Sequence, residues 1–340
     1  MDVRTALARL AERKALDQEE ARQVFAQVMS GEATPAQIGA LLMGFRVKGE
    51  TAEEIAGAAQ TMRDLSVKVE VDVPYLVDTC GTGGSGAKLF NVSTAAAFVT
   101  AAAGAHVAKH GNRKMTSASG SADVLEAAGV NLALTPEQIG QCIRDVGVGF
   151  LFAQAHHGAM KHAAPVRQEL GVRTLMNLLG PLTNPAGARR QVIGVFSPQF
   201  QQIVAEVLRL LGAEHVLVVH ANGLDEIALD GPSFVVELKD GAITSYEIAP
   251  EDFGIERRPV DALRADSPSA SLALVLEALE KPDSAAADMV SLNAGAAVYA
   301  AGVATSLANG VAMAQDAIAA GLARERLDEL VRVSSLMGEP

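Results

Sequence analysis

The sequence predicts an α/β protein with two parts: a small all-α domain, and a larger α/β domain with a mostly parallel central sheet and an antiparallel hairpin. Residues 1–66 show helical periodicity. From about Val71 the pattern changes to short β-rich runs that alternate with helices, which is typical of a parallel sheet with right-handed crossovers. Asp240-Gly241 lies between two β-rich runs and predicts a hairpin turn.

The N-terminal part carries recognisable helix starts. Thr34 suits an N-cap position before Pro35, which fits the first turn of a helix. Residues 51–54, Thr-Ala-Glu-Glu, match a capping box that opens another helix. The nearly apolar run over 38–45 indicates a helix that is buried or lies in an interface. We therefore expect an all-α domain over residues 1–70.

The larger domain, residues 71–340, alternates strands and helices and returns to helix over Ala285–Val331. The candidate strands are Tyr75–Asp78, His106–Ala108, Gln191–Phe196, His215–Val219 and Phe234–Leu238. The candidate helices between them include Ser93–Ala103, Ser121–Ala127, Pro136–Val146 and Pro198–Leu211.

Composition limits the class of partner. The chain has 340 residues, 49% hydrophobic and 20% charged, so a large core is expected. A net charge of −12 disfavours nonspecific binding to nucleic acid or anionic membranes. Cys80 and Cys142 form neither a metal-type spacing nor a disulfide framework. The N-terminus lacks a signal-peptide core, and the apolar run Ala95–Ala108 is too short to span a bilayer. We expect a cytoplasmic protein with no nucleic-acid or membrane partner.

Residues 78–94 are the most informative stretch of the chain. Glycines at 81, 83, 84 and 86 follow an apolar run and lead into an alanine-rich helical pattern. A strand, a glycine-rich turn and a helix N-terminus together form an anion cradle. The spacing matches neither a Walker A motif nor G-x-G-x-x-G. The pattern predicts a phosphorylated ligand other than a P-loop nucleotide or a conventionally bound dinucleotide.

A second strand–loop–helix unit gathers cationic groups and hydroxyls around Gly111. The alternative to a ligand site is a solvated basic loop. Several cations beside hydroxyl donors suit a pyrophosphate or a sugar phosphate, and we favour that interpretation. The residues are Lys109, His110, Arg113, Lys114, Thr116, Ser117, Ser119 and Ser121.

Adjacent carboxylates, Asp225 and Glu226, follow a strong strand of the second half. Such pairs are good ligands for hard cations, and Mg²⁺ commonly bridges carboxylates to substrate phosphates. Alone, the pair could equally be a solvated turn; beside two phosphate cradles, it predicts a Mg²⁺ site.

Histidines cluster over residues 155–162, but His157 and His162 are five apart and do not meet zinc-helix spacing. Packing, or lining a pocket, is the better interpretation. Arg167 and Arg173 could pair with a carboxylate or lie on the surface. No Ser-His-Asp or Cys-His set can be assembled, so we assign no catalytic nucleophile or base.

Taken in order along nearly the whole chain, these motifs resemble those of the anthranilate phosphoribosyltransferase family. The segments that carry the resemblance are Gly81–Gly84, Phe90–Thr94, Lys109–Arg113, Ser119–Asp123, His156-His157, Met160–His162, Asn177–Pro185 and Gly223–Glu226.

The resemblance implies a pentosyl-transferring glycosyltransferase of tryptophan biosynthesis. It would transfer the phosphoribosyl group of 5-phosphoribosyl 1-pyrophosphate to the amine of anthranilate, giving N-(5-phosphoribosyl)anthranilate and pyrophosphate. It also implies a homodimer formed through the helical domain, which adds a later helical segment near 165–185. The aryl amine is neutral at pH 7 and needs positioning more than a strong base, in keeping with the missing nucleophile.

The resemblance further implies roles for individual residues. Mg²⁺ would be held by the pyrophosphate with Ser93, Asp225 and Glu226. Anthranilate would be guided by Gly81, Asn112 and Arg167, with His110 and the 156–157 segment lining its access path. Phosphoribosyl pyrophosphate would contact Gly81, Gly84, Ser85, Leu89, Asn91, Val92, Ser93, Thr94, Lys109, His110, Gly111, Asn112, Arg113, Lys114, Met115, Thr116, Ser117 and Ser121.

Three positions depart from the common pattern of that family. Ser85 stands where many members carry Asp, Leu89 where many carry Thr, and Lys114 replaces a small residue.

Three rival functions stay open at the level of sequence. A pyrimidine nucleoside phosphorylase resembles this fold, but its phosphate loop starts lysine-histidine-serine, where residues 78–81 here read Asp-Thr-Cys-Gly. A non-catalytic sensor would bind a phosphorylated metabolite without turnover. A paralogue would act on a different aromatic amine.

Overall fold

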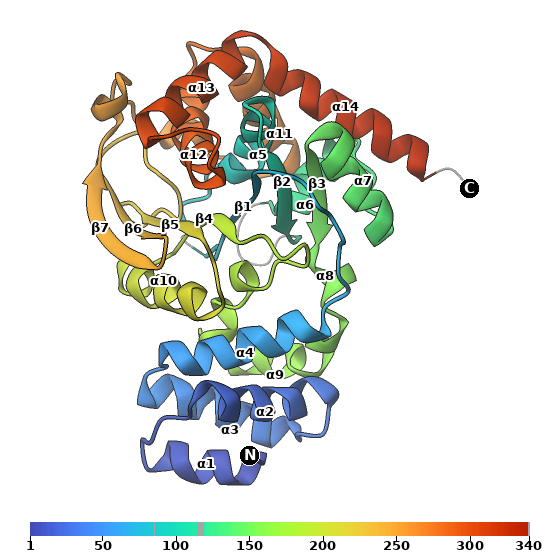
Figure 1. Cartoon of the computed structure of the whole chain (residues 1–340), viewed down its shortest axis with the longest axis vertical. Helices are drawn as coiled ribbons and strands as arrows, with labels where there is room; N and C mark the ends of the chain where they lie inside the picture. The colour runs from blue at the N-terminus through green and yellow to red at the C-terminus, as the bar shows by residue number, and fades with distance from the viewer. Residues whose placement is uncertain (85, 114–118, 339–340) are drawn as a thin grey trace.

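The structure is a computed structural model that describes residues 1–84, 86–113 and 119–338. The predictions for Ser85, Lys114, Met115, Thr116 and Ser117 lie outside the described residues. The molecule is elongated, with a helical part at the N-terminal end and a larger α/β body at the other (Figure 1). Within the described ranges, no helix is long and apolar enough to cross a membrane.

The helical end begins with four helices: α1 (Val3–Ala11), α2 (Gln18–Ser30), α3 (Pro35–Lys48) and α4 (Ala52–Leu65). The predicted caps are confirmed, because Thr34 and Thr51 each form a capping box with the residue three positions on. Glu54 is also fully buried in the core of this end. It forms an ion pair with Lys48 at 2.9 Å and accepts the backbone N–H of Leu16.

The sheet has seven strands in the order β3-β2-β1-β4-β5-β6-β7. The first five strands in this order, from β3 to β5, run parallel to one another. Strand β6 is antiparallel to β5, and β7 is antiparallel to β6. The predicted hairpin turn is confirmed between β6 and β7, where Asp240 and Gly241 have φ of 51° and 81°. The bounds are β1 Leu76–Gly81, β2 His106–Gly111, β3 Val148–Phe152, β4 Arg190–Gly194, β5 His215–His220, β6 Ser233–Lys239 and β7 Ala242–Ile248.

Strand β3 was not among the sequence predictions. Its five residues, Val-Gly-Phe-Leu-Phe, are a short apolar run interrupted by a glycine. Gly149 lets the strand lie against α7 (Pro136–Val146), since a Cβ there would stand 2.5 Å from Ile143 Cγ1. A short apolar run without alternation gives no periodic signal, so the strand is visible only through its pairing with β2.

Helices cover both faces of the sheet. The helices predicted at Ser121–Ala127 and Pro136–Val146 have those bounds, whereas Pro198–Leu211 divides into a 3₁₀ turn, Pro198–Phe200, and α10. The remaining α-helices are α5 Val92–Ala102, α6 Ser121–Ala127, α7 Pro136–Val146, α8 Ala153–His156, α9 Ala164–Leu170, α10 Gln201–Leu210, α11 Pro268–Glu280, α12 Ala285–Ala301, α13 Leu307–Ala319 and α14 Leu322–Met337.

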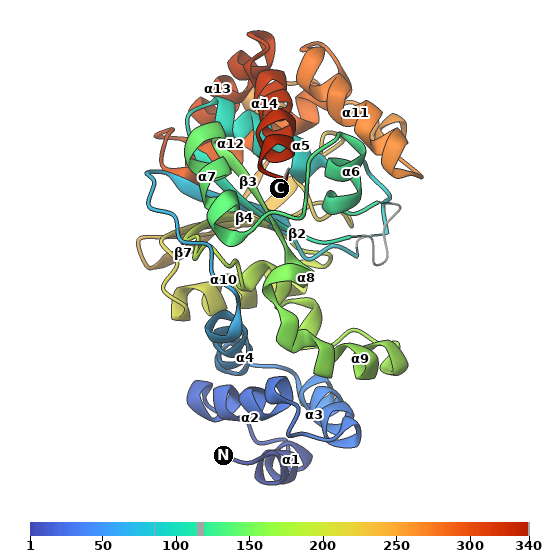
Figure 2. The same ribbon diagram turned by 90° about the vertical axis from the view of Figure 1, so that its right-hand side faces the viewer.

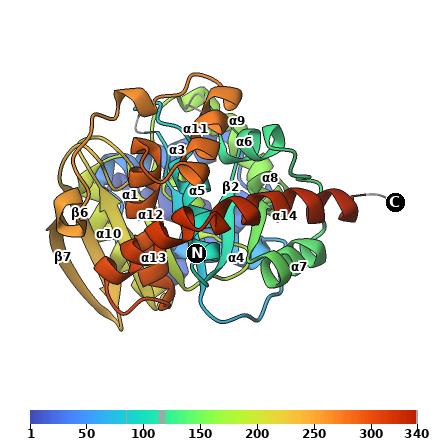
Figure 3. The same ribbon diagram turned by 90° about the horizontal axis from the view of Figure 1, so that it is seen from above.

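Two large apolar clusters fill the layers. One lies between the sheet and helices α5 and α11–α14, which form the upper layer in Figure 1 and lie toward the viewer in Figure 3. The other joins the opposite face of the sheet and α10 to the helical end, and includes Phe25, Phe45, Leu175 and Val218. Helix α9 lies beside α3 at the helical end (Figure 2). The chain therefore returns to the helical end before it adds β4.

Candidate active site

The two predicted phosphate loops lie next to each other. Strands β1 and β2 are parallel neighbours, with Val77 opposite Val107, and end at Gly81 and Gly111. The chain order reverses at β1, which pairs with β2 on one side and β4 on the other. In open α/β sheets, the edge at the carboxyl ends of the strands beside such a reversal is where ligands bind.

The glycine loop after β1 requires its glycines. Gly83, Gly84 and Gly86 have φ of 65°, 80° and 76°, in the left-handed region that other residues rarely adopt. The end of the loop is fixed on a distant segment, because Phe90 N donates to Leu263 O at 2.9 Å and Leu89 pairs with Arg264. The described residues at both ends of the loop are thus bonded to other segments, since Thr82 N also donates to Gly194 O at 2.8 Å.

Helix α5 starts directly after this loop, and its first turn has no side-chain cap. The Asn91 side chain instead accepts hydrogen bonds from Ser119 and Ser271, both at 2.7 Å. The hydroxyl of Thr94 is buried and has no hydrogen-bond partner in the described part of the chain. An uncapped helix start and an unpartnered hydroxyl suit an anionic group of a ligand.

Lys109 points from β2 beneath the same helix start. Its side chain is buried, and its ammonium donates to the carbonyl of Thr79 and to Ser93 Oγ at 3.4 Å. Among the described residues, the ammonium has no salt bridge. A buried cation bonded only to neutral oxygens is well suited to meet a phosphate.

The acidic pair approaches this point from the turn between β5 and β6. A Cβ at Gly194 would lie 1.6 Å from the carbonyl oxygen of Asp225, so only glycine at the end of β4 allows the approach. Asn293 of α12 fixes the following residue, donating to Ile227 O and accepting its N–H. Asp225 Oδ2 comes within 3.1 Å of where a Cβ on Gly81 would stand. The predicted Ser93, Asp225 and Glu226 all line one small cavity.

The electrostatics of this cavity favour a cation. Burial, reinforced by the neighbouring Asp225, raises the pKa of Glu226 to about 8, and Lys109 and the Ser93 N–H oppose that rise only in part. Two carboxylates and a serine hydroxyl are oxygen donors of the type that Mg²⁺ takes. The residues present therefore fit a hard divalent cation, which would supply the positive charge that the pair lacks.

The second loop is brought to the site only in part. Gly111 is needed, because a Cβ there would lie 2.1 Å from Ser121 Oγ. Asn112 O accepts from Ser121 Oγ at 3.4 Å. Arg113, however, forms an ion pair with Glu126 at 2.5 Å and lies over the ring of Phe152. In this conformation the guanidinium faces α6 rather than Lys109.

Three buried histidines, His110, His156 and His157, come from the end of β2 and from the segment after β3. His110 Nδ1 lies 3.1 Å from Gly180 O, and the His110 and His157 ring centroids are 5.1 Å apart. His156 Nδ1 lies 2.7 Å from Val67 O. Burial lowers the pKa of His110 to about 3 and that of His157 to about 4, and it also lowers the pKa of His156. The rings are therefore neutral at pH 7, and each Nε2 lacks a partner within the described residues.

Arg167 lies on α9 and is half-buried. Burial lowers the pKa of its guanidinium, and it forms no salt bridge in the described part of the chain. It is held on the helical end, whereas Gly81 and Asn112 belong to the two loops of the α/β body.

Sequence reasoning missed several residues that build the site. Asp78 is fully buried and accepts from the backbone N–H of His110 at 3.1 Å and from Asn184 Nδ2 at 2.8 Å. Burial raises the pKa of Asp78 to about 6 and also raises that of the neighbouring Cys80 thiol. An aspartate near the end of an apolar run, three residues before the first glycine of the loop, was a usable signal. Gly194 and Asn293 carried no such signal in the sequence, because their role depends on contacts with residues that are distant in the chain.

The parallel-sheet edge with two anion loops, a buried lysine and an acidic pair defines a transferase of the class that handles phosphorylated sugars. The chain matches the helical bundle domain of the glycosyl transferase family over residues 4–66 and the α/β domain of that family over residues 73–324. It is 57% identical to the anthranilate phosphoribosyltransferase of Hahella chejuensis, over 100% of this chain and 99% of that one. The enzyme of Ectopseudomonas mendocina is 56% identical over 99% of this chain and 98% of its own.

Solved structures agree. The anthranilate phosphoribosyltransferase of Thermus thermophilus superposes with a TM-score of 0.92 at 46% identity, over 97% of this chain and 99% of that one. The Saccharomyces cerevisiae enzyme in complex with phosphoribosyl pyrophosphate and Mg has a TM-score of 0.89 at 24% identity and covers 98% of both chains. The chain belongs to the anthranilate phosphoribosyltransferase family, and the predicted resemblance is confirmed.

Proposed function

We propose how this member of the anthranilate phosphoribosyltransferases binds and activates its donor. The reaction moves the phosphoribosyl group of phosphoribosyl pyrophosphate to the amine of anthranilate, a step of tryptophan biosynthesis. The glycine loop after β1 and the loop after β2 hold the donor between them. The observation that carries this proposal is the meeting of Lys109, the uncapped start of α5 and the acidic pair in one place.

The donor's pyrophosphate takes the charges that this edge of the sheet leaves unpaired. Lys109 and the N-terminus of α5 stabilise the negative charge of the leaving group. Ser93, Asp225 and Glu226 would hold Mg²⁺, and the bound ion would supply positive charge to the leaving pyrophosphate. The Thr94 hydroxyl is available as a further donor. The other donor-contact residues keep the roles that the family resemblance implies.

The acceptor needs orientation. Anthranilate carries a carboxylate, and Arg167 is a half-buried guanidinium without an ion pair among the described residues. Arg167 would hold that carboxylate, with Gly81 and Asn112 beside the amine and the neutral ring of His110 on the access path. A neutral ring keeps its Nε2 lone pair available to accept an N–H.

The helical end has a second role in our proposal: the formation of a homodimer. It comprises residues 1–70 and the helical segment near 165–185, while 71–340 forms the donor-binding domain. Helix α3 is apolar on more than one face, and its Val47 is 64% exposed. A Val47→Asp variant is expected to shift the mass measured by light scattering from two chains to one. An unchanged mass would place the interface elsewhere. We also propose a cytoplasmic location.

Loss of anthranilate fluorescence in a mixture of the purified protein, phosphoribosyl pyrophosphate and Mg²⁺ tests the reaction directly. Omission of Mg²⁺ should suppress the loss, and a Lys109→Met variant should slow it by about 100-fold, the size typical for removal of one charge-stabilising donor. Phosphorolysis of thymidine or uridine without fluorescence loss would instead identify a nucleoside phosphorylase. Binding of both substrates without turnover would identify a sensor.

A further inference from the structure

We propose that Arg173 is a positioning residue for the donor loop: its guanidinium reaches from the helical end to the glycine loop after β1 and fixes one peptide of that loop. The inference rests on the proposed function, because it takes this loop to bind phosphoribosyl pyrophosphate. It adds a residue that belongs neither to the donor contacts nor to the metal and acceptor sites.

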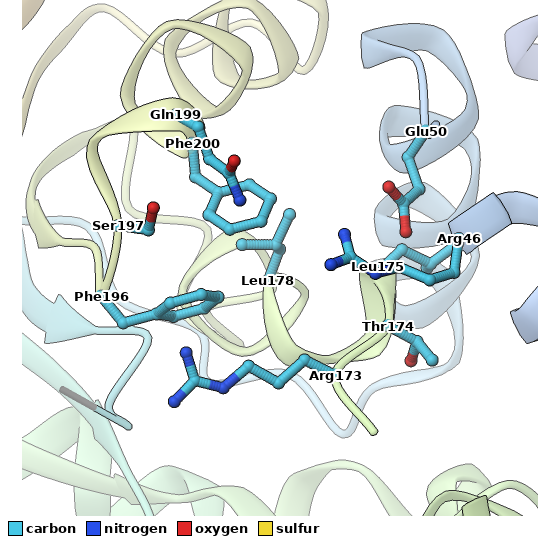
Figure 4. Close-up of a pocket in the computed structure, with 10 residues that line it drawn as sticks. All are labelled: Arg46, Glu50, Arg173, Thr174, Leu175, Leu178, Phe196, Ser197, Gln199 and Phe200. Atoms are coloured by element: carbon cyan, nitrogen blue, oxygen red, sulfur yellow. The ribbon is translucent and has the colours of Figure 1, made fainter. Parts of the chain in front are cut away.

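Arg173 touches two segments of the α/β body at once. Its Nη2 donates to the carbonyl of Gly84 at 2.5 Å, and its guanidinium carbon lies 4.0 Å from the ring centroid of Phe196. Figure 4 shows the guanidinium lying against that ring. Phe196 is itself tied to the glycine loop, since its N–H donates to Thr82 Oγ1 at 3.2 Å. Arg173 therefore closes a ring of contacts among three segments that are distant in sequence.

The backbone that carries Arg173 is well anchored, although its side chain is exposed. Thr174 and Leu175 are buried, and the N–H of Thr174 is accepted by Asn177 Oδ1 at 3.0 Å in the following 3₁₀ turn. Leu175 packs in the cluster that contains α3. Movement of the helical end would therefore be transmitted to the glycine loop through this side chain.

A cavity of about 260 Å³ adjoins the contact. Arg46 of α3 and Glu50, just after that helix, line it on one side, and Phe196 and Phe200 line it on the other (Figure 4). The helical end and the β4–α10 connection are thus separated at this point. Arg173 bridges from the helical end to the body at the edge of this space.

The glycine loop needs such a hold because its conformation is otherwise loosely determined. Gly83 and Gly84 adopt left-handed φ values, and leaving that region costs glycine little energy. A peptide that rotates exchanges an N–H for a carbonyl, and a carbonyl turned toward a phosphate would repel it. The Arg173 bond keeps the Gly84 carbonyl on the side of the helical end. Stacking on Phe196 keeps the guanidinium in the orientation that the bond requires.

Steady-state kinetics of three variants test this role. Arg173→Ala removes the bond and the stacking, Arg173→Lys keeps the charge without the planar fork, and Arg46→Ala removes a guanidinium that lines the same cavity from α3. We expect Arg173→Ala to raise the KM for phosphoribosyl pyrophosphate about tenfold, as for loss of one charge-assisted hydrogen bond, with Arg173→Lys in between. The kcat, the KM for anthranilate and the melting temperature should stay close to those of the unaltered protein. Arg46→Ala should change none of these quantities.

A change in the KM for the donor without a change in the KM for anthranilate distinguishes a positioning role from a structural one. A purely structural role would lower the melting temperature or weaken the binding of both substrates alike. Equal KM values for the donor in Arg173→Ala and the unaltered protein would overturn the proposal. So would equal losses for both substrates, or the same donor effect in Arg46→Ala. The proposed function fails separately, if the unaltered protein itself does not bind phosphoribosyl pyrophosphate with Mg²⁺.

Discussion

The charged side chains at the two ends of the parallel strands differ in whether other residues of the chain neutralise them. At the amino ends of β4 and β5, the charged side chains have partners inside the chain: Arg190 forms an ion pair with Glu214 at 3.1 Å, and Glu237 shares a hydrogen bond of 2.7 Å with His215 Nε2. At the carboxyl ends, the bonds that Lys109 forms with the described residues all go to neutral oxygens, and Glu226 adjoins another carboxylate.

The pKa values of a carboxyl group at each end, Glu237 and Glu226, show the same difference. Burial alone would raise the pKa of Glu237, but hydrogen bonds from His215, Tyr299 and Tyr246 outweigh it and leave the pKa lowered. The pKa of Glu226 is raised to about 8, because nothing of comparable strength offsets its burial. The charged groups at the amino end thus have partners within the chain, and in our proposal those at the carboxyl end are met by the donor and its cation.

Removal of the acidic pair at the carboxyl ends of the strands should have the largest effect on activity. We expect Asp225→Asn combined with Glu226→Gln to lower turnover by about 100-fold or more and to raise the Mg²⁺ concentration needed for half-maximal rate. The melting temperature should hold or rise, since two crowded carboxylates are relieved. Kinetics across a Mg²⁺ titration check this. A double variant with the Mg²⁺ response of the unaltered protein would refute the metal assignment.

A substitution in the proposed anthranilate site should have a smaller effect on activity. Arg167→Ala is expected to lower kcat/KM for anthranilate about tenfold, as for loss of a charge-assisted hydrogen bond, while phosphoribosyl pyrophosphate binds as before. Kinetics with each substrate varied in turn, together with calorimetric titration of the donor, measure the two effects. Equal losses for donor and acceptor would count against the role of Arg167.

A matched change at the amino end should affect stability alone. Glu237→Gln keeps an acceptor for its neighbours but removes the charge opposite His215. We expect the free energy of unfolding to fall by about 1–3 kcal/mol, the range for a buried hydrogen bond to a charged group. The kcat/KM should stay within about twofold. Urea unfolding and steady-state kinetics test both parts, and a large loss of activity with normal stability would contradict the comparison.

The buried histidines near the carboxyl ends should also make the free energy of unfolding depend on pH. The unfolded chain protonates His110 and His157 near the ordinary pKa of 6.5, but the folded chain does so only near pH 3 and 4. Unfolding therefore takes up protons in between, so the free energy of unfolding should fall as pH drops from about 6.5 toward 4. Asp78, whose pKa is raised to about 6, acts in the opposite direction. A His157→Gln variant should show a flatter decline in urea unfolding at several pH values; an unchanged decline would show that the ring does not contribute.

The sequence was sufficient for most of the fold because its strongest signals are local. The caps at Thr34 and Thr51, the Asp240-Gly241 turn and the glycine-rich connections each act within a few residues. What it could not show depends on contacts at long range. Strand β3 is identified by its pairing with β2, and the close approach of Asp225 depends on Gly194 from another strand.

The candidate site divides in the same way. Residue type and order pointed to Lys109 and the acidic pair, and the family resemblance added Ser93; the fold brings all four residues together. Nothing local indicated that Arg113 would pair with Glu126, because that partner lies a full loop away on α6. Arg173 was ambiguous in the sequence for the same reason, since its partners Gly84 and Phe196 belong to other segments.

A crystal soaked with phosphoribosyl pyrophosphate and Mg²⁺ tests the central claim most directly. We predict electron density for the diphosphate at Lys109 and the start of α5, with the metal bound to Asp225 or Glu226 and the ribose beside the glycine loop. A well-ordered donor bound elsewhere, with both loops empty, would contradict the account.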